Sequence, residues 1–161
     1  MPDASTTRPA EPGARRRWMG VLARASTAEL EAAWCALPAP PAYSFLRKPE
    51  TGLVLVRGRA GGTGAAFNLG EMTMTRCAVR LEDSGGNARV TGLGFVAGRD
   101  DRHAQLAAVF DALLQMPRHG TAIDAAVIRP IEERLERDRK TAASDVAATR
   151  VDFFTLVREQ S

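Results

Sequence analysis

The feature that most constrains the fold is a strict alternation of residue types in EMTMTRCAVRL, residues 71–81. Successive side chains of a strand point to opposite faces, so a period of two indicates a strand with two different faces. The alternation divides these side chains into two sets, one of Met72, Met74, Arg76, Ala78 and Arg80 and the other of Thr73, Thr75, Cys77, Val79 and Leu81.

The neighbouring segments also predict strands. YSFLR (43–47) and LVLVRGR (53–59) are joined by KPETG, in which Pro49 suits a turn and Gly52 can take a positive φ. EDSGGN (82–87) predicts a hairpin turn, and Gly92 and Gly94 in the returning strand indicate a bulge or a close backbone approach. No helical stretch interrupts this region, so we predict an antiparallel meander of about four strands.

Helices flank the meander on both sides. Two are predicted before it, and Ser26 and Glu29 would form a capping box at the start of the second. After it, residues 99–116 predict a helix capped by Asp100 or Asp101 and buried against the sheet. Pro130 suits the first turn of a further, charged helix, whose apolar seam runs from Ile131 to Val146.

The fold class is therefore α+β, with a single domain at residues 14–161. Residues 1–13 are rich in Pro, Ala, Ser and Thr and predict a disordered arm. RVDFFTLVR (150–158) predicts a terminal strand or extended segment, because it is too apolar for a free tail. This segment and the 131–146 seam are candidates for either a core or a surface that meets a partner.

Composition excludes several functions. No run of 18 apolar residues and no secretory signal is present, so we expect a cytoplasmic protein without a membrane span. The net charge of +3 is small, and aromatic residues are only 6%, which disfavours reading of DNA sequence. Binding of polyanions through the basic N-terminal arm remains an alternative. Cys35 and Cys77 lie far apart without zinc-ligand spacing, so we expect two reduced thiols and no metal.

The glycine-rich stretch RGRAGGTGAAFNLGE (57–71) raises the question of phosphate binding. A P-loop would need Gly-Lys-Ser/Thr, and a dinucleotide fingerprint would need GxGxxG at the start of a helix. Neither is present. Two interpretations remain: a nest of backbone N–H groups assisted by Arg57 and Arg59, or a bend between two strands.

Few residues in the chain suit a catalytic nucleophile or a metal site. His103 and His119 are the only histidines, which excludes a site built from several histidines. The acids of EERLERDR alternate with arginines at helical spacing and predict an ion-paired surface. The densest polar cluster beside glycines contains Arg99, Asp100, Arg102 and His103, and capping of the following helix explains it. The residues thus indicate a soluble domain without a catalytic set of its own.

Four blocks in order carry a family resemblance: RWMGVLARA, ETGLVLVRGRAGGTGAAFNLGEMTMTRCAVRL, GRDDRHAQLAAVFDALLQ and RVDFFTLVR. They resemble the PhnG subunit of bacterial carbon–phosphorus lyase from about Arg17 to Arg158. The chain departs from the family pattern at Gln105, where an acid would be expected, and in AAFNLGE. The first departure argues against a catalytic carboxylate at position 105.

The resemblance implies a cytoplasmic core complex that degrades phosphonates. Its implied partners are a nucleosidase-like PhnI subunit, a PhnH subunit, a PhnL subunit similar to ABC ATPases, and a radical-SAM PhnJ subunit. The complex exchanges the adenine of ATP for a phosphonate and forms ribose 1-phosphonate 5-triphosphate. ATP is then a substrate, the iron–sulfur cluster and SAM belong to PhnJ, and this chain itself holds no cofactor. Paired copies are expected within the hetero-oligomer, with no nucleic acid and no membrane.

The resulting hypothesis is an accessory subunit without catalytic residues. The candidate partner- or phosphate-binding positions are Arg59, Gly61, Gly62, Thr63, Gly64, Arg76, Arg99, Asp100 and His103. An alternative is a subunit that binds the triphosphate or phosphonate itself and contributes catalytic residues.

Overall fold

The computed structural model describes residues 12–59, 64–82 and 89–148, and they confirm the α+β class. Two helices, α1 (Pro12–Leu22) and α2 (Thr27–Cys35), precede the strands β1 (Tyr43–Gly58), β2 (Phe67–Glu82) and β3 (Arg89–Ala97). The helices α3 (Asp101–Gln115), α4 (Pro117–Ile123) and α5 (Arg129–Ala148) follow, with a π-helical turn, η2 (Asp124–Ile128), before α5. The predicted terminal segment 150–158 lies outside the described residues, as do residues 1–11 of the predicted arm; α1 begins at Pro12.

The three described strands form an antiparallel sheet in the order β1-β2-β3. We expected about four strands, with a turn at KPETG, but β1 runs through this segment without interruption. The register shifts between Phe45 and Glu50, so the extra residues form an irregularity within one strand. Pro49 is tolerated because β1 lies at an edge of the sheet, where a missing N–H costs no ladder hydrogen bond.

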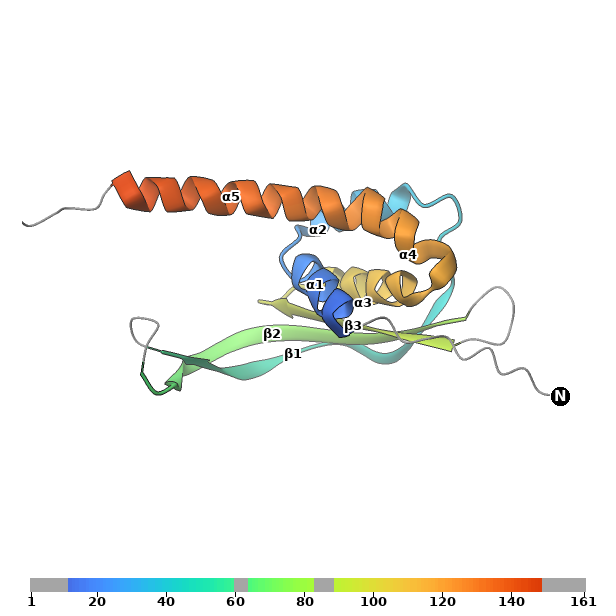
Figure 1. The fold of residues 1–161 in the computed structure, drawn as a ribbon. Helices are drawn as coiled ribbons and strands as arrows, with labels where there is room; N and C mark the ends of the chain where they lie inside the picture. Colours follow the sequence, from blue (N-terminus) through green and yellow to red (C-terminus); the bar gives the residue numbers. More distant parts are fainter. Residues whose placement is uncertain (1–11, 60–63, 83–88, 149–161) are drawn as a thin grey trace, which may run out of the picture.

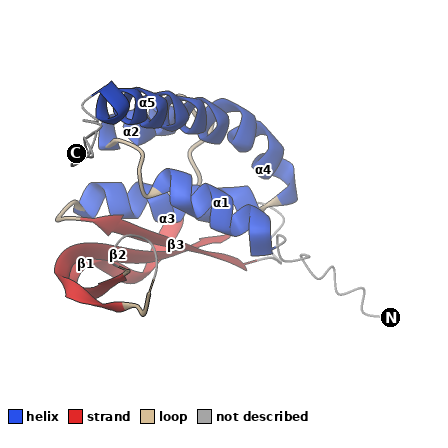
Figure 2. Ribbon diagram, turned by 60° about the vertical axis from the view of Figure 1, so that its left-hand side comes forward, coloured by secondary structure: helices blue, strands red, loops and turns tan. Residues whose placement is uncertain are grey.

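The two faces predicted for β2 are confirmed. Thr75, Cys77, Val79 and Leu81 are buried, and they make up the inner face of the sheet together with alternate residues of β3. The other set of β2 side chains belongs to the outer face, which none of the described helices covers in Figures 1 and 2. The alternation therefore determines which face of the sheet packs against the helices.

Helix α3 lies directly on the inner face because β3 has glycines where the two backbones approach. A Cβ atom at Gly92 would lie 1.9 Å from the carbonyl oxygen of Ala108, and one at Gly94 would lie 2.1 Å from that of Ala104. The pairing of β2 with β3 continues without a shift. Of the two interpretations of these glycines, the close approach is therefore correct.

The helices form two layers above the sheet, as Figures 1 and 2 show: α1 and α3 lie next to it, and α2 and α5 lie beyond them. The predicted capping box of α2 is present, with Ser26 and Glu29 exchanging hydrogen bonds. Burial along the predicted seam of α5 ends early. Ile131 is buried and Leu135 is partly buried, but Val146 is exposed.

One part of the sheet extends beyond the helical layers. The last pair between β2 and β3 is Met74 with Ala97, whereas β1 and β2 continue pairing as far as Gly58 and Phe67. Residues 53–58 and 67–73 thus form a two-stranded extension, called the arm below, which projects from the body in Figure 1. It carries exposed apolar side chains, of which Leu53 is 65% and Leu55 54% exposed.

Candidate functional site

The glycine-rich stretch connects β1 to β2 at the tip of the arm. Gly64 has a φ of +84°, and its carbonyl oxygen accepts a hydrogen bond of 2.9 Å from Nη1 of Arg59. The strand β2 begins at Phe67, so no helix follows the glycines and the two named phosphate motifs are absent. Gly61, Gly62 and Thr63 lie outside the described residues, and their role remains a prediction.

The corner between β3 and α3 is a helix cap. One oxygen of Asp100 accepts the backbone N–H of His103 at 2.8 Å, and the other accepts the Thr27 hydroxyl at 2.6 Å. These two hydrogen bonds lower the pKa of Asp100 because they stabilise its charged form. The bond from Thr27 has the larger effect. The predicted capping role is confirmed, and Asp100 also ties α2 to α3.

His103 has a structural role in the same corner. Its ring is buried, and Nε2 lies 2.8 Å from the carbonyl oxygen of Leu22, the last residue of α1. The ring therefore satisfies a backbone group at a helix end that would otherwise lack a partner. Nearby, Nε of Arg102 pairs with Glu31 at 2.6 Å. The side chain of Gln105, the departure from the family pattern, donates to the Tyr43 hydroxyl.

The structure does not bring the predicted site residues together. Arg59 and Gly64 lie at the tip of the arm, whereas Asp100 follows the end of β3 at the base of the arm. The seven steps along β2 from Met74 to Phe67 span about 24 Å of strand. Arg76 also belongs to the base, where its Nε pairs with Glu50 at 2.6 Å. A single ligand cannot contact both groups in one copy of the chain.

Sequence reasoning missed the buried carboxylate of Asp111, which is fully inaccessible to solvent. It accepts hydrogen bonds from Arg15 at 2.7 Å, from the Trp18 indole at 2.8 Å and from the backbone N–H of Leu93 at 2.9 Å. Gln115 is a fourth donor residue. The signal in the sequence was an acid within the apolar run LAAVFDALLQ, which requires buried donors.

The two thiols differ in environment. Cys35 is exposed, whereas Cys77 is buried on the inner face of the sheet. Burial first, and the charge of Asp101 second, raise the pKa of Cys77 to about 11. Since the thiolate is the reactive form, Cys77 is poorly suited to act as a nucleophile.

Hollows mark the surface of the described residues, and two of them lie beside charged side chains. One, of about 140 Å³, lies over Gly52 on the outer face of the sheet, between Glu50, Val54, Met74 and Arg76. The other, of about 460 Å³, lies beside α1 and η2, where Arg17 and Arg129 both pair with Asp124. The described part of the chain contains no cluster of side chains suited to a metal ion. None of its helices has the length and hydropathy that a membrane crossing requires.

Comparison with known proteins gives two findings. The model of a family described as phosphonate metabolism protein PhnG matches residues 13–159. A relative from Rhizobium meliloti (strain 1021) is 45% identical over 158 residues, which cover 98% of this chain and 97% of the relative. That relative is named alpha-D-ribose 1-methylphosphonate 5-triphosphate synthase subunit PhnG.

Proposed function

Because the chain belongs to the PhnG family of phosphonate metabolism proteins, we propose that it is an accessory subunit of a ribose 1-methylphosphonate 5-triphosphate synthase. In this role it supports the transfer of a phosphonate to the ribose of ATP with release of adenine. The observation that carries the proposal is the 45% identity to the named synthase subunit over 98% of the chain. A match of this extent includes the whole described fold.

The side chains support an accessory role because the reactive groups singled out here have structural partners. His103 binds a helix-terminal carbonyl group, Asp100 caps α3, and Asp111 is saturated with donors. No buried side-chain nitrogen or oxygen of the described residues lacks a hydrogen-bond partner. A catalytic acid or base needs a free position toward the substrate, and both carboxylate oxygens of Asp100 and of Asp111 already accept hydrogen bonds within the fold.

In the proposed complex, the other subunits would provide the catalytic groups and the cofactors. The PhnI-type subunit would provide the nucleosidase-like chemistry, with PhnH-, PhnL- and PhnJ-type subunits as further partners. ATP would be a substrate of the complex, and the iron–sulfur cluster and SAM would belong to the PhnJ-type subunit. Two copies of this chain would be present in one cytoplasmic assembly. The glycine-rich stretch would position a partner loop or a substrate phosphate.

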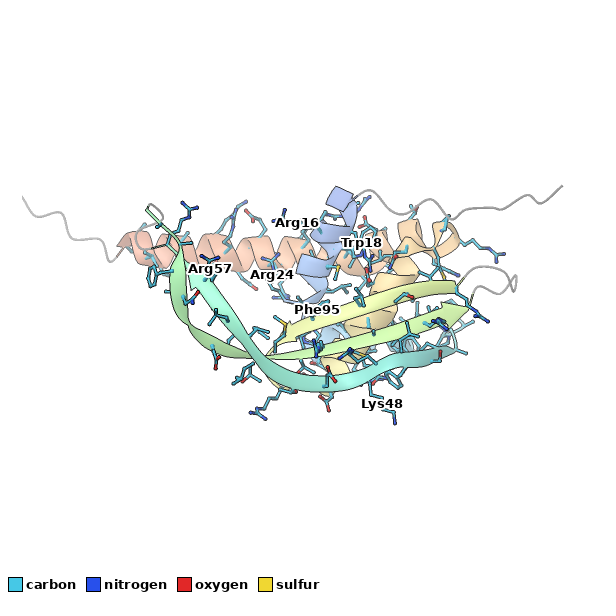
Figure 3. All side chains as sticks on the ribbon, turned by 90° about the horizontal axis from the view of Figure 1, so that it is seen from below. Arg16, Trp18, Arg24, Lys48, Arg57 and Phe95 are labelled. Carbon is cyan, nitrogen blue, oxygen red and sulfur yellow. The ribbon has the colours of Figure 1, made fainter. Side chains whose placement is uncertain are left out.

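A second candidate is direct contact with the triphosphate, favoured by Arg57 near the tip of the arm (Figure 3). Its side chain is exposed and has no ion pair among the described residues. A guanidinium group in this state is available to bind phosphate.

The test is reconstitution of the synthase. The chain is co-expressed with the PhnI-type, PhnH-type and PhnL-type subunits, and size-exclusion chromatography and adenine release from ATP with methylphosphonate are measured. Co-elution is expected, with phosphonate transfer lost when this chain is omitted. Bare nucleosidase activity of the PhnI-type subunit should remain. Transfer that proceeds equally well without the chain would refute the accessory role.

A variant separates the two candidates. Arg57→Ala is compared with the unmodified chain after both have assembled with the other subunits, and a rise in the KM for ATP would favour direct triphosphate contact. Arg16→Ala is the matched control, because Arg16 is also exposed and lies on α1. An unchanged KM for ATP in Arg57→Ala would count against the second candidate.

A further inference from the structure

The outer face of the sheet carries a continuous apolar strip. The register places Leu93 beside Ala78, Phe95 beside Arg76, and Met74 beside Gly52. Phe95 is 41% exposed, and Figure 3 shows it on the side of the sheet away from the helices. The strip continues into the arm through Val54 and Met72, which are register partners.

The same face has an excess of positive charge. Arg47, Arg76 and Arg80 alternate with the inner-face residues, and among the described residues no carboxylate other than Glu50 pairs with any of them. Glu50 binds both Arg47 and Arg76, and these arginines lower its pKa, Arg47 more strongly. Arg80 is half-buried and has no ion pair among the described residues. Carboxylates from another molecule would complement this surface.

The hollow over Gly52 lies in the middle of this strip. An added Cβ atom at Gly52 would have no atom within 4 Å, so the floor of the hollow is open backbone. Its volume of about 140 Å³ is of the size of one apolar side chain. Interfaces are commonly anchored by a single apolar or aromatic side chain that fills such a pocket.

We propose that the outer face of the sheet, from Arg80 to Val54, binds another protein subunit that inserts an apolar side chain into the hollow over Gly52. The same partner presents carboxylates to Arg80 and Arg76. The inference rests on the proposed function, since it requires that the chain work as a subunit, and adds the surface and the chemistry of the partner. The arm extends the contact, because it exposes large apolar side chains and β3, the third strand of the described part of the chain, stops pairing before it.

Charge argues against the other occupants of this face. A symmetric contact with a second copy through this face would place the same arginines against one another, which is unfavourable. Nucleic acid would satisfy the arginines, but proteins that bind single strands stack successive bases on several aromatic rings. In this strip Phe95 is one ring among aliphatic and thioether side chains such as Leu93, Met74 and Val54. A protein surface with carboxylates around an apolar side chain would complement both the arginines and the apolar strip of this face.

The test uses the chain co-expressed with the other synthase subunits, and variants are compared by co-purification and by titration of the separately purified chain into the remaining subunits. Gly52→Leu fills the hollow and should weaken association by at least about tenfold. Gly13→Leu is the matched control, because Gly13 on α1 also has no atom within 4 Å of an added Cβ. Its affinity should equal that of the unmodified chain.

Charge reversal provides an independent test. Arg80→Glu should also weaken association, and the loss should diminish at high salt because the contact is electrostatic. Arg16→Glu, an equally large charge change on exposed α1, should have little effect. Circular dichroism and thermal unfolding verify that each variant is folded.

The outcomes distinguish the two proposals. If the unmodified chain fails to associate, the accessory function is wrong and this inference is overturned with it. If it associates and Gly52→Leu and Arg80→Glu associate equally well, only the inference about this surface is overturned. Binding of a short single-stranded oligonucleotide or of ATP by the chain alone, lost in Arg80→Glu, would also overturn it. Dimerisation of the purified chain that Gly52→Leu abolishes would assign the face to a second copy instead.

Discussion

At the scale of single residues, Asp111 connects three elements, because its donors come from α1, β3 and α3. We expect Asp111→Ala to lower the free energy of unfolding by about 3 kcal/mol, since it leaves the Arg15 guanidinium and the Trp18 indole without their acceptor. Urea unfolding followed by tryptophan fluorescence measures this change. Asp101→Ala, on the exposed first turn of the same helix, is the control. Equal effects of the two variants would contradict a structural role for Asp111.

The thiols give a second prediction at this scale. Iodoacetamide at pH 8 should add one carbamidomethyl group to the native protein, at Cys35, because Cys77 is 2% exposed and its pKa is about 11. In urea both cysteines should react. Mass spectrometry of tryptic peptides identifies the modified position. Modification of Cys77 in the native protein at the rate of Cys35 would show that the inner face of the sheet opens readily.

At the scale of elements, the packing of α3 on β3 depends on glycine. Gly92→Ala should lower the free energy of unfolding by at least about 2 kcal/mol, because its Cβ would overlap the backbone of α3. Gly52→Ala, also in a strand but over an open hollow, should change it by less than about 0.5 kcal/mol. Thermal and urea unfolding of the two variants test this contrast, and comparable stability would mean that α3 can move away from the sheet.

The cap of α3 makes stability depend on pH. The pKa of Asp100 is lowered in the folded state, so its contribution is present above its ordinary pKa of 3.8 and is lost as the pH falls through the lowered value. Asp100→Ala should therefore cost about 1 kcal/mol at pH 7 and progressively less below pH 4. Asp100→Asn keeps an acceptor and should retain most of the stability at pH 7. Urea unfolding between pH 3 and 7 measures both; a difference that does not vary with pH would rule out the charged cap.

At the scale of the whole molecule, arginine–carboxylate pairs between distant segments hold the outer helical layer. Arg17 of α1 binds Glu132 of α5 at 2.5 Å and Asp124 of η2 at 2.8 Å. Both hydrogen bonds raise the pKa of Arg17, and the bond to Glu132 has the larger effect. Arg134 of α5 similarly binds Glu29 of α2 at 2.6 Å.

Loss of one such pair should loosen a layer rather than unfold the molecule. Arg17→Ala should increase amide hydrogen exchange in the first turns of α5 about fivefold, as expected for an exposed network worth about 1 kcal/mol. Exchange in α3 should not change. Hydrogen exchange with mass spectrometry resolves the two helices, and Arg16→Ala is the control. Equal acceleration in α3 and α5 would mean that the layers open together.

The local elements could be predicted from the sequence because each depends on neighbours in the chain. The alternation of Met72 to Leu81 defined both faces of β2, and Ser26 with Glu29 defined the start of α2. The absence of a phosphate-binding helix after the glycines followed from the lack of helical periodicity there. These features depend on contacts within a few residues, which a pattern of spacing records.

The tertiary structure alone decided how distant residues meet. KPETG became an irregularity within β1 because β2 offers a continuous partner across it, which the turn residues themselves do not reveal. The partners of Asp111 come from three separate segments, and the separation of Arg59 from Asp100 follows from the length of the arm beyond β3. The exposed apolar strip is likewise a product of register and of where the helices end. Such features depend on contacts between residues far apart in the sequence, which local spacing does not record. The sequence by itself therefore determined most of the helices and strands and the family resemblance. The packing of these elements determined which surfaces the protein exposes.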